Sequence, residues 1–97
     1  PLSMAETVLP FKPMSNSASS DVGDVSWNVP TAGVATACWI PGTPPHSWQA
    51  VACGGTDIAM KGMMNAAKVM AFTAVDLFSN PLELEVAKKE FLENRGD

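Results

Sequence analysis

Residues 57–78 read DIAMKGMMNAAKVMAFTAVDLF, and this stretch decides more of the fold than any other part of the chain. Its apolar residues recur every three or four positions, as on one face of an amphipathic helix. Thr56 precedes it as a suitable N-cap, and Asp57 falls in the first turn, where an acidic residue is favoured. The stretch predicts a helix from Asp57 to Phe78. We expect its methionines to belong to a core, because methionine at this spacing is more often core than an adaptable binding face.

A second and more polar helix is predicted to follow directly. Ser79 or Asn80 serves as its cap, Pro81 occupies the first turn, and Gly96 ends it. The prolines and serines of residues 1–21 favour loop, apart from a short helix around Leu2 to Leu9.

Three stretches before the first helix favour extended structure. Val25 to Val29 alternates apolar and polar residues, which is typical of a strand that faces one core. Gly33 to Ile40 is apolar on both sides, as in a strand covered by helices on both faces. Ser47 to Cys53 is a further short extended run that ends at Gly54. The predicted fold class is therefore α/β, with short strands followed by two helices.

Composition limits the partners of the chain. Its 97 residues make one domain at most, and only 16% are charged, against about a quarter in an average soluble domain, so some apolar surface is expected to meet a partner. The net charge of −4, without a basic cluster, argues against nucleic acid and anionic membranes. Lys61, Lys68 and Asp76 interrupt the longest apolar stretch, which excludes a membrane span. We expect a soluble, cytoplasmic location.

His46 is the only histidine and the first candidate for chemistry. A lone loop histidine is more often an ordinary surface residue, but His46 follows a proline-rich loop at the end of a predicted buried strand, where α/β proteins commonly place sites. A zinc site of Cys38, His46 and Cys53 needs a fourth ligand and matches no short ligand motif. Both cysteines are expected to be free thiols.

Other residues have two interpretations each. Asp21 and Asp24 are a ligand pair, a general-base pair or simply turn residues at the entrance to a strand. Trp27, Trp39 and Trp48 either line a pocket for an aromatic group or fill a core.

Three segments carry a family resemblance: SSDVGDVSWNVP at residues 19–30, PGTPPHSWQ at residues 41–49, and the helical residues 62–77. They resemble the C-terminal end of the amidohydrolases in the dinuclear-metal peptidase and aminoacylase superfamily, in the branch that includes p-aminobenzoyl-glutamate hydrolases. The resemblance covers about residues 17–91. It implies that residues 1–97 are the C-terminal segment of a mixed-sheet metallopeptidase catalytic domain.

The resemblance also implies a site and its partners. His46 matches the last ligand of two divalent metal ions, which are zinc, manganese or cobalt in this superfamily. Asp21 and Asp24 match an acidic motif beside the site, and Ser47 and Trp48 flank the ligand and shape the pocket. The other ligands and the catalytic glutamate belong to N-terminal catalytic and lid segments that these residues do not include, and the intact protein is expected to be a homo-oligomer.

The function implied is cleavage of the amide bond of N-acyl or N-aroyl amino acids, such as p-aminobenzoyl-glutamate, or of dipeptides by metal-activated water. With one histidine the chain does not assemble the ligands that two metals need, so the chain alone is expected to be inactive and to contain no catalytic residue of its own. The alternative is a non-catalytic binding or assembly domain whose methionine-rich helix packs on a partner, with His46 incidental.

Overall fold

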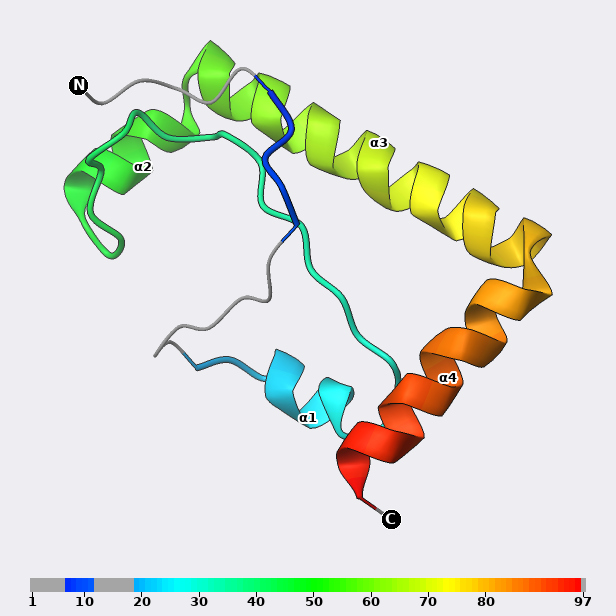
Figure 1. Cartoon of the computed structure of the whole chain (residues 1–97). Coiled ribbons are helices and arrows are strands. Elements are labelled where there is room, and N and C mark those ends of the chain that lie inside the picture. Colours follow the sequence, from blue (N-terminus) through cyan, green and yellow to red (C-terminus); the bar gives the residue numbers. More distant parts are fainter. Residues whose placement is uncertain (1–6, 12–18, 97) are drawn as a thin grey trace. The chain divides into compact units, whose positions relative to one another are not determined.

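A computed structural model describes residues 7–11 and 19–96. Its regular elements are the helices α1 (Val22–Ser26), α2 (Trp48–Gly54), α3 (Asp57–Ser79) and α4 (Pro81–Arg95), shown in Figure 1. These described residues contain no strand. The predicted α/β class, with short strands from a mixed sheet, is therefore wrong for the part of the chain that the structure describes.

The stretch from Val25 to Val29, predicted as a strand, contains the end of α1 and a turn. Ser26 Oγ donates a hydrogen bond to the carbonyl oxygen of Gly23 at 2.7 Å, and Asn28 Nδ2 donates to that of Asp24 at 2.8 Å. Serine and asparagine side chains that bond to nearby backbone groups compete with a β-ladder. These local bonds outweigh the two-residue alternation of apolar and polar side chains.

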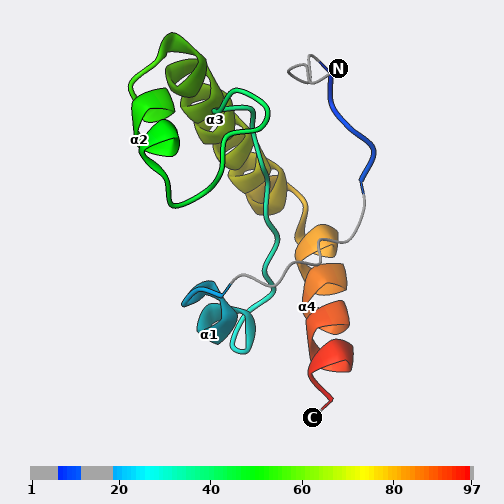
Figure 2. The ribbon, with the colours of Figure 1, turned by 90° about the vertical axis from the view of Figure 1, so that its left-hand side faces the viewer.

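The predicted strand from Gly33 to Ile40 is also absent. A strand needs the N–H and carbonyl groups of a neighbouring strand, and the described residues supply none. Residues 34–40, called the crossing segment below, instead contact α3, where Thr36 Oγ1 donates to the carbonyl oxygen of Gly62 at 2.9 Å. Figures 1 and 2 show this segment beside the first half of α3.

The predicted extended run from Ser47 to Cys53 is a helix. Ser47 has extended backbone, with φ −130° and ψ 163°, and its Oγ accepts a hydrogen bond from the backbone N–H of Ala50 at 3.1 Å. Serine in this position is a strong N-cap, and the alanines that follow are good helix formers. This cap starts α2 in the stretch for which the sequence predicted an extended run.

The two C-terminal helices confirm the sequence prediction. Thr56 Oγ1 accepts from the backbone N–H of Ala59 at 3.3 Å and so caps α3. Asn80 is the N-cap residue of α4, and Pro81 takes the first helical position. Gly96 ends α4 in a left-handed conformation with φ 80°, and its N–H donates to the carbonyl oxygen of Leu92 at 3.3 Å. Helix start and stop signals are therefore reliable in this chain.

The described chain divides into two compact units, and the division falls within α3. The first unit comprises residues 7–11 and 34–71, which include the crossing segment, α2 and most of α3. The second comprises residues 19–33 and 72–96, which include α1, the end of α3 and α4. The contacts that bear on function lie within the first unit.

Very few side chains are buried. Cys53 and Ala59 are the buried hydrophobic residues of the described part, at 9% and 8% exposure, and Gly62 is also buried. The methionines of α3 are exposed, so the predicted apolar stripe exists but is not a core here. Many large apolar side chains of the described residues are therefore exposed.

No helix within the described ranges is both long and apolar enough to cross a membrane. The helix predicted around Leu2 to Leu9 lies largely outside the described residues, and residues 7–9 are not helical. The loop prediction for residues 1–21 is tested at residues 7–11 and 19–21, which form no helix or strand.

Candidate functional site

Two turns in succession carry the candidate histidine. In the first, the N–H of Thr43 donates to the carbonyl oxygen of Ile40 at 3.1 Å, with Pro41 and Gly42 in the middle. Gly42 has φ 89°. Proline at the second position and a positive φ at the third are the marks of a type II turn, which requires glycine or asparagine at the third position. This turn redirects the chain away from the crossing segment.

The second turn repeats the arrangement with His46 in place of glycine. Pro45 precedes His46, whose φ is 56°, and His46 is the non-glycine residue with positive φ among the described residues. Such a conformation is uncommon for residues with a side chain and costs of the order of 1 kcal/mol or more. The chain therefore holds an exposed imidazole in a backbone conformation that glycine would adopt more easily. Strain of this kind is concentrated at functional positions.

Ser47 fixes the position that follows His46. Its Oγ donates to the carbonyl oxygen of Pro44 at 2.5 Å and accepts from the N–H of Ala50 at 3.1 Å. One hydroxyl therefore closes the turn around His46 and caps α2. The predicted role of Ser47 in shaping a pocket stays a prediction, but its observed contacts are those of a residue that positions its neighbour.

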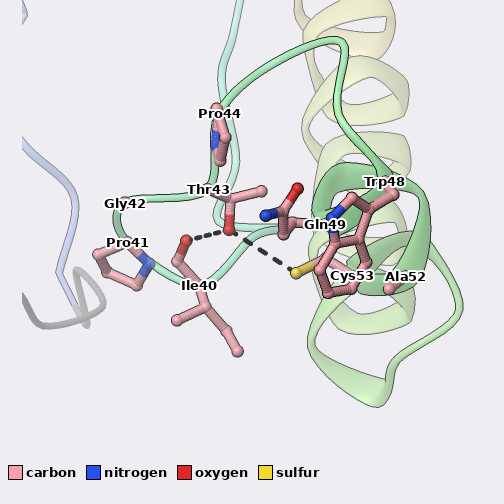
Figure 3. A pocket seen from close by; sticks show the side chains of 9 residues that line it. All are labelled: Ile40, Pro41, Gly42, Thr43, Pro44, Trp48, Gln49, Ala52 and Cys53. Carbon is pink, nitrogen blue, oxygen red and sulfur yellow. Dashed lines mark hydrogen bonds between the residues drawn. The ribbon is translucent and has the colours of Figure 1, made fainter.

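A shallow hollow of about 360 Å³ opens between the first turn and α2. The lining side chains are shown in Figure 3, with Trp48 and Gln49 projecting from α2 opposite Pro41 and Pro44. Thr43 lies between Ile40 and Cys53, which also line the hollow. The Trp48 indole is 76% exposed, so it lines the hollow without filling a core. The structure thus places one predicted pocket residue, Trp48, in an apolar hollow next to the His46 turn.

Thr43 joins this turn to α2. Its Oγ1 donates to the carbonyl oxygen of Ile40 at 2.6 Å and lies 3.7 Å from Cys53 Sγ (Figure 3). A hydroxyl has one proton, and a carbonyl cannot donate, so the thiol of Cys53 is the donor in the second contact. This buried cysteine is therefore a structural partner of the turn.

Asp21 and Asp24 lie in the second unit, and the structure does not join them with His46 in one unit. Asp21 is the N-cap residue of α1 without a side-chain cap hydrogen bond, and Asp24 is in the first turn. Both are exposed. These placements agree with the interpretation as turn residues at the start of an element, although that element is a helix. Their expected place beside the site stays a prediction.

Among the described residues, His46 could serve as one metal ligand, but these residues do not form a complete metal site. No group of three or more His, Cys, Asp or Glu residues that could hold a metal occurs within residues 7–11 and 19–96. The zinc site considered for Cys38, His46 and Cys53 is therefore absent from this part of the chain. Cys38 and Cys53 are free thiols. His46, with an exposed imidazole on a constrained turn, fits a single ligand of a larger set.

Sequence reasoning missed the contact between Thr36 and Gly62. A glycine inside a strongly helical pattern was the available signal, because helix propensity disfavours it and close packing explains it. A Cβ at Gly62 would overlap the carbonyl oxygen of Ala37 and the sulfur of Cys38. The glycine therefore marks the place where the crossing segment meets α3.

The sequence is similar to part of a known hydrolase. It is 46% identical over 89 residues to a subunit of p-aminobenzoyl-glutamate hydrolase from Escherichia coli (strain K12). The match covers 90% of this chain and 18% of that relative, so the chain spans less than a fifth of the relative's length. No family model and no solved structure matches the chain. The similarity confirms the resemblance to p-aminobenzoyl-glutamate hydrolases that the sequence motifs indicate.

Proposed function

We propose that the chain is the C-terminal part of a metal-dependent amidohydrolase that cleaves p-aminobenzoyl-glutamate or a related N-acyl or N-aroyl amino acid. The observation that carries the proposal is the 46% identity with a p-aminobenzoyl-glutamate hydrolase along 90% of the chain. The reaction adds water to the amide carbonyl and breaks the C–N bond, releasing a carboxylic acid and an amine. The relative is one subunit of its hydrolase, which supports an oligomer as the working form.

The role proposed for His46 is that of one metal ligand. A divalent ion, when bound, supplies polarisation of a carbonyl and a more acidic water in such hydrolases. The neutral imidazole offers one nitrogen lone pair, and the positive φ of 56° explains why the side chain leaves the turn in a constrained direction. Because the described residues provide no complete ligand set, the remaining ligands and the general base are proposed to come from the rest of the full-length protein.

The exposed apolar surface of α3 supports the proposal that other parts of the full-length protein complete the site. Met60, Met63 and Met70 are 47%, 57% and 66% exposed on α3. A monomer does not normally leave such a stripe in water, since burying one of these side chains is worth about 1.5–3 kcal/mol. We propose that the rest of the full-length protein covers this face. The same observation is what favours the second candidate, a non-catalytic assembly domain in which His46 has no role.

Hydrolysis of p-aminobenzoyl-glutamate by the full-length protein with added divalent metal tests the proposal. His46→Ala is an imperfect variant, because alanine at positive φ changes the backbone as well as the ligand. His46→Asn and His46→Gly remove the imidazole and still tolerate the conformation. We expect both to lose activity without a lower thermal midpoint, and His46→Gly to keep or raise the midpoint, since it relieves strain.

The controls separate the two candidates. Val51→Ala changes an exposed residue of α2 that does not line the hollow, and it should retain activity. Full activity in His46→Asn would exclude His46 as a ligand and favour the assembly domain. Activity in the 97-residue chain alone would contradict the proposal that other segments supply the remaining ligands.

A further inference from the structure

Position 62 brings α3 and the crossing segment into unusually close contact. Gly62 is buried, and a side chain there would overlap backbone atoms of Ala37 and the sulfur of Cys38. The absence of a Cβ is thus what allows the two backbones to approach. The helix accepts a residue of poor helix propensity at this place, which indicates that the contact matters more than local helix stability.

A chain of two hydrogen bonds runs through the contact. Thr36 Oγ1 donates to the carbonyl oxygen of Gly62 at 2.9 Å and lies 3.6 Å from Cys38 Sγ. The single hydroxyl proton goes to the carbonyl, so the Cys38 thiol donates to Thr36. Both Thr36 and Cys38 are half-buried. The hydroxyl therefore links the crossing segment to one definite point on α3.

We propose that Thr36, Cys38 and Gly62 form a clasp that positions His46. The inference rests on the proposed function, because it assigns a role to the clasp through the ligand role of His46. The clasp sets where the crossing segment lies along α3, and the loop to His46 begins at the end of that segment. Thr36 is then a positioning residue without contact to the reacting atoms.

The loop between the clasp and His46 is stiff enough to transmit this placement. Pro41, Pro44 and Pro45 each have a fixed φ, and the Thr43 hydroxyl closes the first turn. At the far end Ser47 is held by its bonds to Pro44 and Ala50. A shift of the crossing segment is therefore passed on to His46 and is not absorbed by the loop.

The test compares Thr36→Val with Thr36→Ser in the full-length protein. Valine keeps the shape and removes the donor, whereas serine keeps the hydroxyl. Steady-state hydrolysis of p-aminobenzoyl-glutamate gives kcat and KM, and the metal concentration for half-maximal activity is measured alongside. A thiol reagent, with labelling located at the Cys38 peptide by mass spectrometry, gives a readout that needs no activity, and the Cys53 peptide serves as internal reference.

We expect Thr36→Val to lower kcat by about 10- to 100-fold, the loss that a displacement of about 1 Å at a reacting group causes. The metal requirement should rise, KM should change less, and Cys38 should be labelled faster while Cys53 is unchanged. Thr36→Ser should restore all four values to near those of the unmodified protein. Thermal midpoints establish that each variant is folded.

Each other outcome overturns the inference in a recognisable way. Unchanged kcat and metal requirement in Thr36→Val, with a lower thermal midpoint or faster Cys38 labelling, would show a clasp that is only structural. A loss of kcat that Thr36→Ser does not restore would show that the hydroxyl bond is not the cause. Full activity in His46→Asn removes the proposed function itself, and the positioning role with it, whereas loss of activity in His46→Asn with a normal Thr36→Val removes the positioning role alone.

Discussion

Replacing Gly62 by alanine sets two physical effects against each other. Helix propensity alone favours alanine inside α3 by about 1 kcal/mol. The added methyl group, however, would overlap the carbonyl oxygen of Ala37 and the sulfur of Cys38. Overpacking of this kind costs about 1–3 kcal/mol, and a backbone carbonyl cannot rotate aside as a long side chain does. We expect the variant to be less stable than the unmodified protein by up to about 2 kcal/mol, the difference of these effects.

Gly54→Ala is the matched control. Gly54 is also helical, but a Cβ there would meet nothing within 4 Å. The control should be neutral or stabilising by up to about 1 kcal/mol. The gap between the two variants then measures the overpacking at the clasp.

Thermal unfolding of the full-length protein and labelling of Cys38 measure the effect. A change of 1 kcal/mol moves the midpoint by about 2–4 °C in a protein of 150–250 residues, and by less in a longer one. Gly62→Ala should therefore show a lower midpoint than Gly54→Ala and faster labelling of Cys38. A Gly62→Ala protein as stable as its control, with unchanged labelling, would refute the close approach of the crossing segment to α3.

Three further changes test the site and its supports. Ser47→Ala should lower stability by about 1 kcal/mol through loss of the α2 cap, and also lower kcat, while Ser47→Thr retains most of both; unfolding and steady-state assays decide. Trp48→Ala should raise KM for p-aminobenzoyl-glutamate with little change in the thermal midpoint, since the indole is 76% exposed. Trp48→Phe should keep the KM. An unchanged KM in Trp48→Ala would show that the hollow is not part of the substrate site. Gly96→Ala forces a side chain into φ 80° at the end of α4 and should cost about 1 kcal/mol without a change in KM, measured by the same assays.

The two C-terminal helices, α3 and α4, were predictable because their signals are local. The N-cap of α3, the proline at the start of α4 and the glycine at its end each act within one turn, so the sequence contains the whole cause. The strand predictions were wrong because alternation states only which side chains share a face. Whether the backbone forms a strand depends on a partner strand. In Val25 to Val29, side chains instead form hydrogen bonds to nearby backbone carbonyl groups.

The candidate site could be predicted as a sequence motif, but its geometry could not. The proline-rich loop and the lone histidine make His46 a candidate, and the structure adds that His46 lies in a turn with positive φ. The positive φ of His46 could not be predicted from the sequence. Glycine is the residue that normally indicates such a conformation, and the glycine of this loop, Gly42, lies in the first turn. Ser47 was placed beside the site for the family motif it belongs to, whereas its hydrogen bonds indicate a cap and a turn closure.

The apolar stripe of α3 shows how far periodicity can be taken. Spacing of three and four residues correctly predicts the helix, but it carries no information on what covers the apolar face of that helix. Ala59 and Gly62 are the buried residues of α3, and Gly62 admits the crossing segment, while the methionines remain exposed. The small residues near Gly62 and the large, flexible methionines elsewhere on α3 imply that the helix has two different neighbours. The neighbour at Gly62 is the crossing segment, which leads to His46. The neighbour of the methionines is the surface that we propose the rest of the full-length protein supplies. On this proposal α3 would connect the candidate ligand to the segments that complete its site.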